Sequence, residues 1–213
     1  METTDLVTDA GALEALYPPA NPRSLAKESD VLTPGYGALI EASPFVVVAT
    51  RGPAGLDCSP RGDRPGFVQV ADERTLLLPD RRGNNRLDTL HNLLHDPDIA
   101  LIFLIPGVGE TVRVRGTAVI STDPDLIGRT AHNGIKPATV LVISVSRVYF
   151  QCQRAVVRSG LWDPSVHVDR ATLPTAGDLQ REVGVLDAAQ AADYDATLDD
   201  YVRATLYEGP SKH

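Results

Sequence analysis

The stretch Ser59-Pro-Arg-Gly-Asp63 holds the residues in this chain that are best suited to bind an anion. Ser59 offers a hydroxyl, and Arg61 offers a planar guanidinium that can donate two parallel hydrogen bonds to a phosphate or carboxylate. Gly62 lets a ligand approach the backbone closely. Placed at a strand edge, these three residues predict a cradle for an oxyanion.

A second stretch with the same chemistry is Asp80-Arg-Arg-Gly-Asn-Asn-Arg86, which stands immediately before a predicted helix. Helix N-termini attract phosphate, and Arg86 falls in the first turn. Because both stretches adjoin strand ends, we expect them to converge on one phosphate. In the alternative interpretation Arg61 and Arg86 are structural and pair with Asp63 or Asp80.

Three other patterns are weaker than they first look. His91 and His95 have metal-ligand spacing on a helix, but the glutamate of a His-Glu-x-x-His motif is missing, so we predict a solvated pair. Gly107-Val-Gly109 lies between two predicted strands with no helix after it, which favours a hairpin turn over a dinucleotide site. Ser59 lacks the setting of a nucleophile elbow. The sequence therefore predicts no metal site and no particular catalytic residue.

The elements that must position these residues are mainly strands. β-branched and alternating runs predict strands over 45–50, 66–70, 75–79, 99–105, 110–120 and 139–150, with the start of another at 56–58. Helical patterns cover 34–42, 85–95 and 188–206, with a short helical turn at 123–124. A doubly wound sheet would need a helix between each pair of strands, so this order indicates a barrel with helical decoration.

The helix over 85–95 directly follows the second arginine stretch. Asn84 or Asn85 is the expected N-cap, and Asp88 in the first turn suits the helix dipole. Its apolar residues are spaced to form one face, namely Leu87, Leu90, Leu93 and Leu94.

Composition limits the function classes. The chain has 213 residues, of which 43% are hydrophobic and 23% charged, which fits one domain with terminal extensions. The net charge of −8 argues against a general nucleic-acid binder. Residues 51–162 nevertheless hold fourteen Lys and Arg against eleven acids, between two acidic ends. That distribution suggests a small anionic ligand in the middle, or else ordinary scatter of surface charge.

The sequence shows no membrane span, no secretory signal and only two cysteines, and these features predict the compartment of the protein and the redox state of its cysteines. No apolar run approaches the ~20 residues of a membrane span, and the N-terminus lacks the pattern of a secretory signal. We therefore expect a cytoplasmic protein with no membrane partner. Cys58 and Cys152 are expected to be reduced, buried structural thiols.

Several motifs, in order, resemble the FMN-dependent split barrels related to pyridoxamine-5′-phosphate oxidase. They are SPFVVVAT, SPRGDRPGF, LLLPDRRGNNRLDTLHNLLHDP, IALIFLIPGVGETVRVRGTAVI and the late segments CQRA and RSGLW. The resemblance covers about residues 33–164 and is nearest to a bacterial branch of general PPOX-type flavoproteins. It implies a mainly β (α+β) fold: a six-stranded FMN-binding split β-barrel with peripheral helices, forming a homodimer. Residues 1–32 and 165–213 would then be extensions.

The resemblance also implies roles for particular residues. Ser59, Arg61 and Gly62 match the strand that reaches the flavin and its phosphate, and Asn85 and Arg86 match the phosphate-binding step into the helix. Pro79 and Asp80 match the strand end beside the isoalloxazine ring. The remaining matches are residues expected at a subunit interface with the flavin: Glu110, Thr111, Arg113, Arg154, Arg158 and Trp162.

The implied function is an FMN-dependent oxidoreductase that moves hydride through flavin N5 to or from a small organic substrate. A cation near the N1/O2 edge, such as Arg113 or Arg61, would stabilise the reduced flavin. One alternative is an F420-dependent reductase on the same fold. Another is a flavin-binding or haem-binding protein without turnover. The acidic end 193–201 lacks the arginine and histidine motif of the pyridoxamine phosphate oxidases, so oxidation of vitamin B6 phosphates is not expected.

Overall fold

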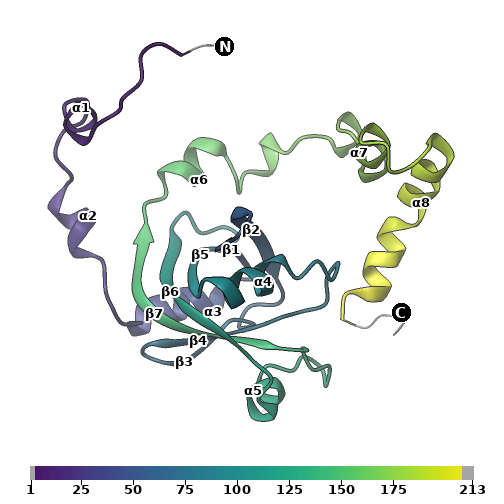
Figure 1. The fold of residues 1–213 in the computed structure, drawn as a ribbon, viewed down its shortest axis with the longest axis horizontal. Helices are drawn as coiled ribbons and strands as arrows, with labels where there is room; N and C mark the ends of the chain where they lie inside the picture. The colour runs from purple at the N-terminus through teal and green to yellow at the C-terminus, as the bar shows by residue number, and fades with distance from the viewer. Residues whose placement is uncertain (1–2, 208–213) are drawn as a thin grey trace.

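The computed structural model describes residues 3–207 (Figure 1). The helices are α1 Ala10–Glu14, α2 Pro22–Ala26, α3 Pro34–Ala42, α4 Asp88–His95, α5 Pro124–Arg129, α6 Arg154–Ser159, α7 Ala176–Glu182 and α8 Ala188–Thr205. The strands are β1 Phe45–Gly52, β2 Gly55–Gly62, β3 Gln69–Asp72, β4 Thr75–Pro79, β5 Asp98–Leu104, β6 Thr111–Ser121 and β7 Val140–Gln151. Two short 3-10 turns, Pro164–Val166 and Arg170–Thr172, follow α6.

All strands belong to one sheet in the order β2-β1-β5-β6-β7-β4-β3, and every pairing is antiparallel. The six strands expected from the resemblance are therefore seven in the described part of the chain. The expected start of a strand at 56–58 is a full strand, because β2 pairs with β1 along its whole length from Gly55 to Gly62. The strand expected at 66–70 begins later, at Gln69, because Gly66 turns the chain at a φ of 86°.

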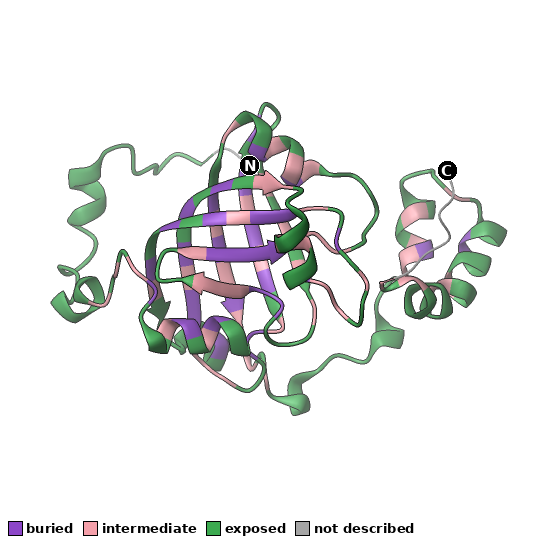
Figure 2. Ribbon diagram, turned by 90° about the horizontal axis from the view of Figure 1, so that it is seen from below, coloured by how far each residue is buried: buried purple, intermediate pink, exposed green. Residues whose placement is uncertain are grey.

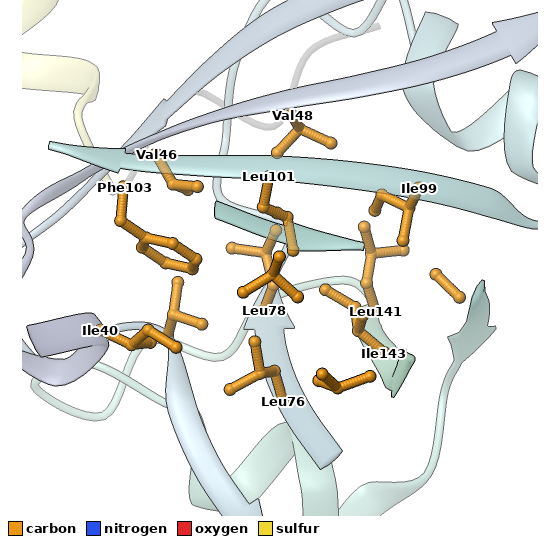
Figure 3. Close-up of a cluster of buried hydrophobic side chains, with 14 of the residues drawn as sticks. Ile40, Val46, Val48, Leu76, Leu78, Ile99, Leu101, Phe103, Leu141 and Ile143 are labelled. Carbon is orange, nitrogen blue, oxygen red and sulfur yellow. The ribbon is translucent and has the colours of Figure 1, made fainter. Parts of the chain in front are cut away.

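The sheet curls on itself to enclose one apolar core. Val46 and Val48 of β1 belong to the same buried cluster as Leu76 and Leu78 of β4, although three strands separate β1 from β4 in the sheet. Figure 3 shows these side chains facing one another across the interior, with Phe103 at one side. Alternation along the strands sends every second residue inward, so the barrel follows from the pattern of apolar residues.

A bulge in the longest strand pair assists this curl. The register between β6 and β7 shifts between Arg115 and Gly116. A Cβ at Gly116 would collide with the carbonyl oxygen of Ser144 on the facing strand. Glycine is needed here because two backbones approach too closely for a side chain.

Two helices cover the barrel, and one differs from expectation. In α3 the Thr33 side chain caps the helix by accepting from the Tyr36 amide, at 3.3 Å. In α4, which packs against β1, Leu93 is buried but Leu94 is 77% exposed. The prediction that Leu94 belongs to the apolar face was wrong, because only the arc of α4 that includes Thr89 and Leu93 meets the barrel.

The terminal segments lie outside the barrel. Neither α1 nor α2 has a buried residue, and α8 has only Ala191. In Figure 2 the paired helices α7 and α8 stand beside the barrel, on the side opposite α1 and α2. No helix among residues 3–207 combines the length and hydropathy needed to cross a membrane.

Candidate functional site

A cavity of about 830 Å³ opens where the two arginine stretches meet. Four segments line it: the end of β2, the β4–α4 connection with the first turn of α4, the loop before β7, and Tyr207 after α8. Of the residues expected to bind the cofactor, six belong to the lining: Ser59, Arg61, Gly62, Asp80, Asn85 and Arg86. Pro79 is buried at the end of β4, directly before Asp80.

Arg61 lines the cavity and is held in place by neutral partners. Its Nη2 donates to the hydroxyl of Thr89 at 3.1 Å, and its Nη1 donates to the Pro60 carbonyl at 3.0 Å. Its Nε is 4.0 Å from the Asp80 carboxylate, which is the outer limit of an ion pair. Because this pairing is loose, most of the charge of Arg61 is left for a ligand.

The connection from β4 to α4 is shaped by unusual backbone. Asn85 and Leu87 both lie in the left-handed region, with φ of 56° and 60°. Leu87 is the N-cap of α4 and makes no side-chain cap, so the expected cap by Asn84 or Asn85 was wrong. The Asn84 side chain instead accepts from the Arg86 amide at 3.2 Å. The first-turn amides of α4 therefore lack a side-chain cap next to the cavity, which is the arrangement that binds anions.

Arg86 fits the expected place but has a nearby acid. Its Nε is 2.7 Å from the carboxylate of Asp88, and both side chains are largely exposed. Surface pairs of this kind contribute little free energy and rearrange readily. The alternative hypothesis, that Arg61 and Arg86 pair with Asp63 or Asp80, is therefore confirmed only in part. Arg61 lies loosely beside Asp80, whereas Arg86 pairs with Asp88.

The firmest ion pair at the site is that between Arg81 and Asp63. The Asp63 side chain is 2% exposed and accepts from Arg81 Nε at 2.7 Å, from the Arg64 amide at 2.7 Å and from the Tyr207 hydroxyl. Burial works to raise the pKa of Asp63, but these three hydrogen bonds outweigh it and lower the pKa below the ordinary range. Asp63 is therefore an ionised anchor beside the cavity.

The pKa of Asp80 is shifted in the opposite direction from that of Asp63. Burial raises the pKa of this carboxyl, and the nearby Arg61 only partly offsets the shift. A half-buried carboxylate next to a cationic wall opposes the binding of an anion unless it is neutralised or turned away.

The remaining cations of the cavity are Arg82 and Lys136. Within residues 3–207 neither lies within 4.0 Å of a carboxylate. Together with Arg61, Arg81 and Arg86 they give the lining five cationic side chains, against the acids Asp57, Asp80 and Asp88. The cavity is therefore electropositive in an acidic protein.

The other predicted residues lie elsewhere in the chain. Glu110, Thr111 and Arg113 are at the start of β6, and none of them lines the cavity. Arg113 lies over the ring of Tyr149 at 5.3 Å and donates to Gln151 at 3.3 Å.

The three remaining residues of this second group follow β7. The indole Nε1 of Trp162 donates to the Val108 carbonyl at 2.8 Å, next to the β5–β6 turn. Arg158 is exposed in the last turn of α6, and Arg154 is exposed in its first turn. Within a single chain, the residues of this second group do not line the cavity.

The histidine pair, the glycine turn and the two cysteines do not line the cavity. His91 and His95 are both exposed, and no cluster of three potential metal ligands occurs among the described residues. Gly107 and Gly109 lie in the β5–β6 turn. Both cysteines are free, but they are exposed rather than buried, because Cys58 is on the edge strand β2 and Cys152 follows the last strand.

Three residues of the cavity were not predicted from the sequence, namely Thr89, Lys136 and Tyr207. Thr89 falls within an ordinary helical pattern, so the sequence does not distinguish it from its neighbours. In the structure its side chain is buried, at 2% exposure, beside Arg61. Lys136 and Tyr207 reach the cavity from segments that show no motif, so only the tertiary structure could have found them.

The fold and the site together are those of an antiparallel barrel with an electropositive cavity beside a helix N-terminus, an arrangement that favours small anionic ligands. The model of the pyridoxamine 5′-phosphate oxidase family matches residues 32–152, more than half of the chain. The chain belongs to this family of flavin-binding, oxidoreductase-like proteins.

Solved structures similar to this chain share little sequence with it. HupZ of Group A Streptococcus is 20% identical, with a TM-score of 0.47 over 56% of this chain and 94% of that one. General Stress Protein 26 of Bacillus anthracis is 15% identical, with a TM-score of 0.42 over 53% and 88%. A protein of the pyridoxinephosphate oxidase family from Clostridium acetobutylicum is 17% identical, with a TM-score of 0.41 over 54% and 84%. No curated protein matches the chain.

Proposed function

We propose that this protein is an FMN-dependent oxidoreductase that acts on a small organic substrate and holds the FMN phosphate in the 830 Å³ cavity. The observation that carries the proposal is the meeting of two separate arginine stretches at one cavity. Arg61 comes from β2 and Arg86 from the start of α4.

The residues of the cavity suit a phosphate monoester. Arg61 supplies a guanidinium that Thr89 holds in place, and the first-turn amides of α4 supply donors without a side-chain cap. The Ser59 hydroxyl is now bonded to Asp57 at 3.0 Å, and it can turn to donate to a phosphate oxygen. The volume falls within the range typical of cofactor pockets, roughly 300–1,000 Å³.

Bound FMN would supply hydride transfer at its N5 atom. The chain's own part is to bind and orient the cofactor. The phosphate contacts of Arg61 and of the first-turn amides of α4 would fix one end of the cofactor. Asp80, directly after β4, would set the charge at the cavity wall beside the cofactor. We assign no side chain a role as nucleophile.

We further propose that the active form is a homodimer with its flavin sites at the subunit interface. Glu110, Thr111, Arg113, Arg158 and Trp162 match family positions at the flavin, yet within one chain they do not line the cavity. A second copy that presents these residues would complete the site. The outer face of β1 and β5 offers an apolar surface for this contact, with Phe45 39% exposed.

The decisive experiment compares FMN with riboflavin, which lacks the phosphate. The purified protein should be yellow, release FMN on denaturation and, after removal of the flavin, bind FMN far more tightly than riboflavin in fluorescence titration. The phosphate contacts predict a preference of at least a hundredfold, about 2.7 kcal/mol.

Each other result points to a different function. Equal affinity for the two flavins would place the phosphate outside this cavity. A colourless protein that binds F420 would move the chain to deazaflavin chemistry. A bound flavin that neither nicotinamide donors nor candidate substrates reduce or reoxidise would indicate a carrier or sensor. Sedimentation of the holoprotein as a monomer would contradict the shared site.

A further inference from the structure

The C-terminal arm, defined here as residues 175–207, is anchored to the barrel at its far end by a single residue. Tyr207 donates its hydroxyl to Asp63 and stacks on His132, with ring centroids 4.6 Å apart and planes inclined by 20°. Among the described residues, this is the only hydrogen bond between the arm and the barrel. Tyr207 also lines the cavity.

The rest of the arm is a self-contained helix pair. Asp195 of α8 accepts from the Thr175 hydroxyl and from the Gly177 amide, the latter at 2.8 Å. A Cβ at Gly177 would meet the Ala191 carbonyl oxygen at 2.5 Å, so the two helices touch backbone to backbone. In Figure 1 this pair stands to one side of the barrel, and the chain returns to the barrel only at its end. The arm is therefore stiff within itself and lightly attached.

The attachment point is joined to the cavity wall. The Asp63 carboxylate that receives Tyr207 also holds Arg81, which belongs to the β4–α4 connection. One buried carboxylate thus links the end of the arm to the loop that carries Asn85 and Arg86. His132, the stacking partner, lies shortly before the lining segment 135–138.

We propose that the C-terminal arm is a strap that closes one wall of the cavity, with Tyr207 as its clasp, and that release of Tyr207 opens the cavity for ligand entry and exit. The clasp consists of one charge-assisted hydrogen bond and one aromatic stack. Such a contact is strong enough to hold the strap shut most of the time and weak enough to open during turnover. The inference rests on the proposed function only for its probe, FMN.

The test uses the full-length protein with two substitutions and one matched control. Tyr207→Phe keeps the stack and removes the hydroxyl, and Tyr207→Ala removes both. Tyr201→Ala changes another tyrosine of the arm, which is 59% exposed and belongs to no site described above. Stopped-flow flavin fluorescence gives the rates of FMN association and release. Hydrogen exchange gives the protection of the amides in 81–87 and 198–206.

A strap predicts that Tyr207→Ala raises both FMN rates by about tenfold or more, with a smaller change in the equilibrium constant. Tyr207→Phe should give an intermediate increase, and Tyr201→Ala should match the wild type. Amides 81–87 and 198–206 should exchange faster in Tyr207→Ala alone.

Two results would overturn the proposal. Rates and protection in Tyr207→Ala equal to those in Tyr201→Ala would show that Tyr207 closes nothing. Faster release without faster association would make Tyr207 a simple ligand contact. If neither the wild-type protein nor any variant binds FMN, the proposed function fails, and the hydrogen-exchange measurement alone then decides whether the strap exists.

Discussion

Arg61 of β2 donates from Nη2 to the hydroxyl of Thr89 in the first turn of α4, across 3.1 Å. This bond joins the two segments that the sequence marks for anion binding, and it fixes the guanidinium at the cavity without neutralising it. A preorganised cation of this kind loses little entropy when a phosphate binds.

The first prediction concerns the two arginines of the cavity. Arg61→Ala and Arg86→Ala should each weaken FMN binding by about 1.5–3 kcal/mol while changing riboflavin binding little, because each removes a charge-assisted contact to the phosphate. Arg51→Ala is the control, since Arg51 pairs with Asp96 and does not line the cavity. Calorimetric titration measures the affinities, and unchanged FMN affinity in both cavity variants would contradict the assignment.

Asp80 provides a prediction about stability. Burial raises the pKa of Asp80 in the folded state above its ordinary value of 3.8. The free energy of unfolding therefore falls as the pH rises from 3.8 through the folded pKa, and the full loss of stability is present at neutral pH. Asp80→Asn should therefore stabilise the protein at pH 7 by about 1 kcal/mol, the scale on which buried polar groups alter stability. Urea unfolding at pH 7 measures the effect, with Asp200→Asn as a near-neutral control, because Asp200 is exposed within α8 and does not line the cavity. A loss of stability in Asp80→Asn would show that the loose pair with Arg61 matters more than burial.

Asp63 should behave in the opposite way. Its folded pKa is lowered, so its contribution is complete above the ordinary value of 3.8 and is lost as the pH falls through the folded pKa. Asp63→Asn leaves Arg81 half-buried without its anion and should cost about 3 kcal/mol at pH 7. Unfolding curves from pH 7 to pH 2.5 should show this difference holding steady down to about pH 5 and shrinking below 3.8. A difference independent of pH would mean that the carboxylate charge is not what stabilises the pair.

Two neighbouring leucines of α4 test the packing of that helix. Leu93 is 6% exposed and Leu94 is 77% exposed. Leu93→Ala should lower the free energy of unfolding by about 2–4 kcal/mol through a cavity in the core, whereas Leu94→Ala should change it by less than about 0.5 kcal/mol. Thermal unfolding of the two variants side by side gives the comparison, and equal effects would show that α4 lies otherwise on the barrel.

The bulge at Gly116 makes the last prediction. Gly116→Ala puts a methyl group against the carbonyl oxygen of Ser144. Because this oxygen belongs to the backbone of β7 and the methyl group is attached directly to the backbone of β6, the clash can be relieved only by disturbing the β6–β7 pairing. We expect a loss of about 3 kcal/mol or more, or no folded protein. Gly83→Ala is the control, because a Cβ there meets nothing within 4 Å. Normal stability of Gly116→Ala would disprove the close approach.

The sequence by itself determined most of the elements and both of the arginine stretches that line the cavity. Strand alternation needs only local pattern, so the spans that became β1, β4, β5, β6 and β7 could be predicted within a residue or two. Arginine, serine and glycine beside strand ends carry their chemistry in their types, which is why Ser59, Arg61 and Arg86 could be selected from residue type and spacing alone.

Only the tertiary structure decided how those residues are used. Which arc of α4 is buried depends on the barrel beside it, so the periodicity alone placed Leu94 wrongly. The start of α4 depends on the left-handed backbone at Asn85 and Leu87, and residue propensities do not predict this conformation for a leucine. Tyr207 meets Asp63 across 144 positions of the chain. Contacts between distant segments are set by the closure of the whole barrel, and local sequence does not encode them.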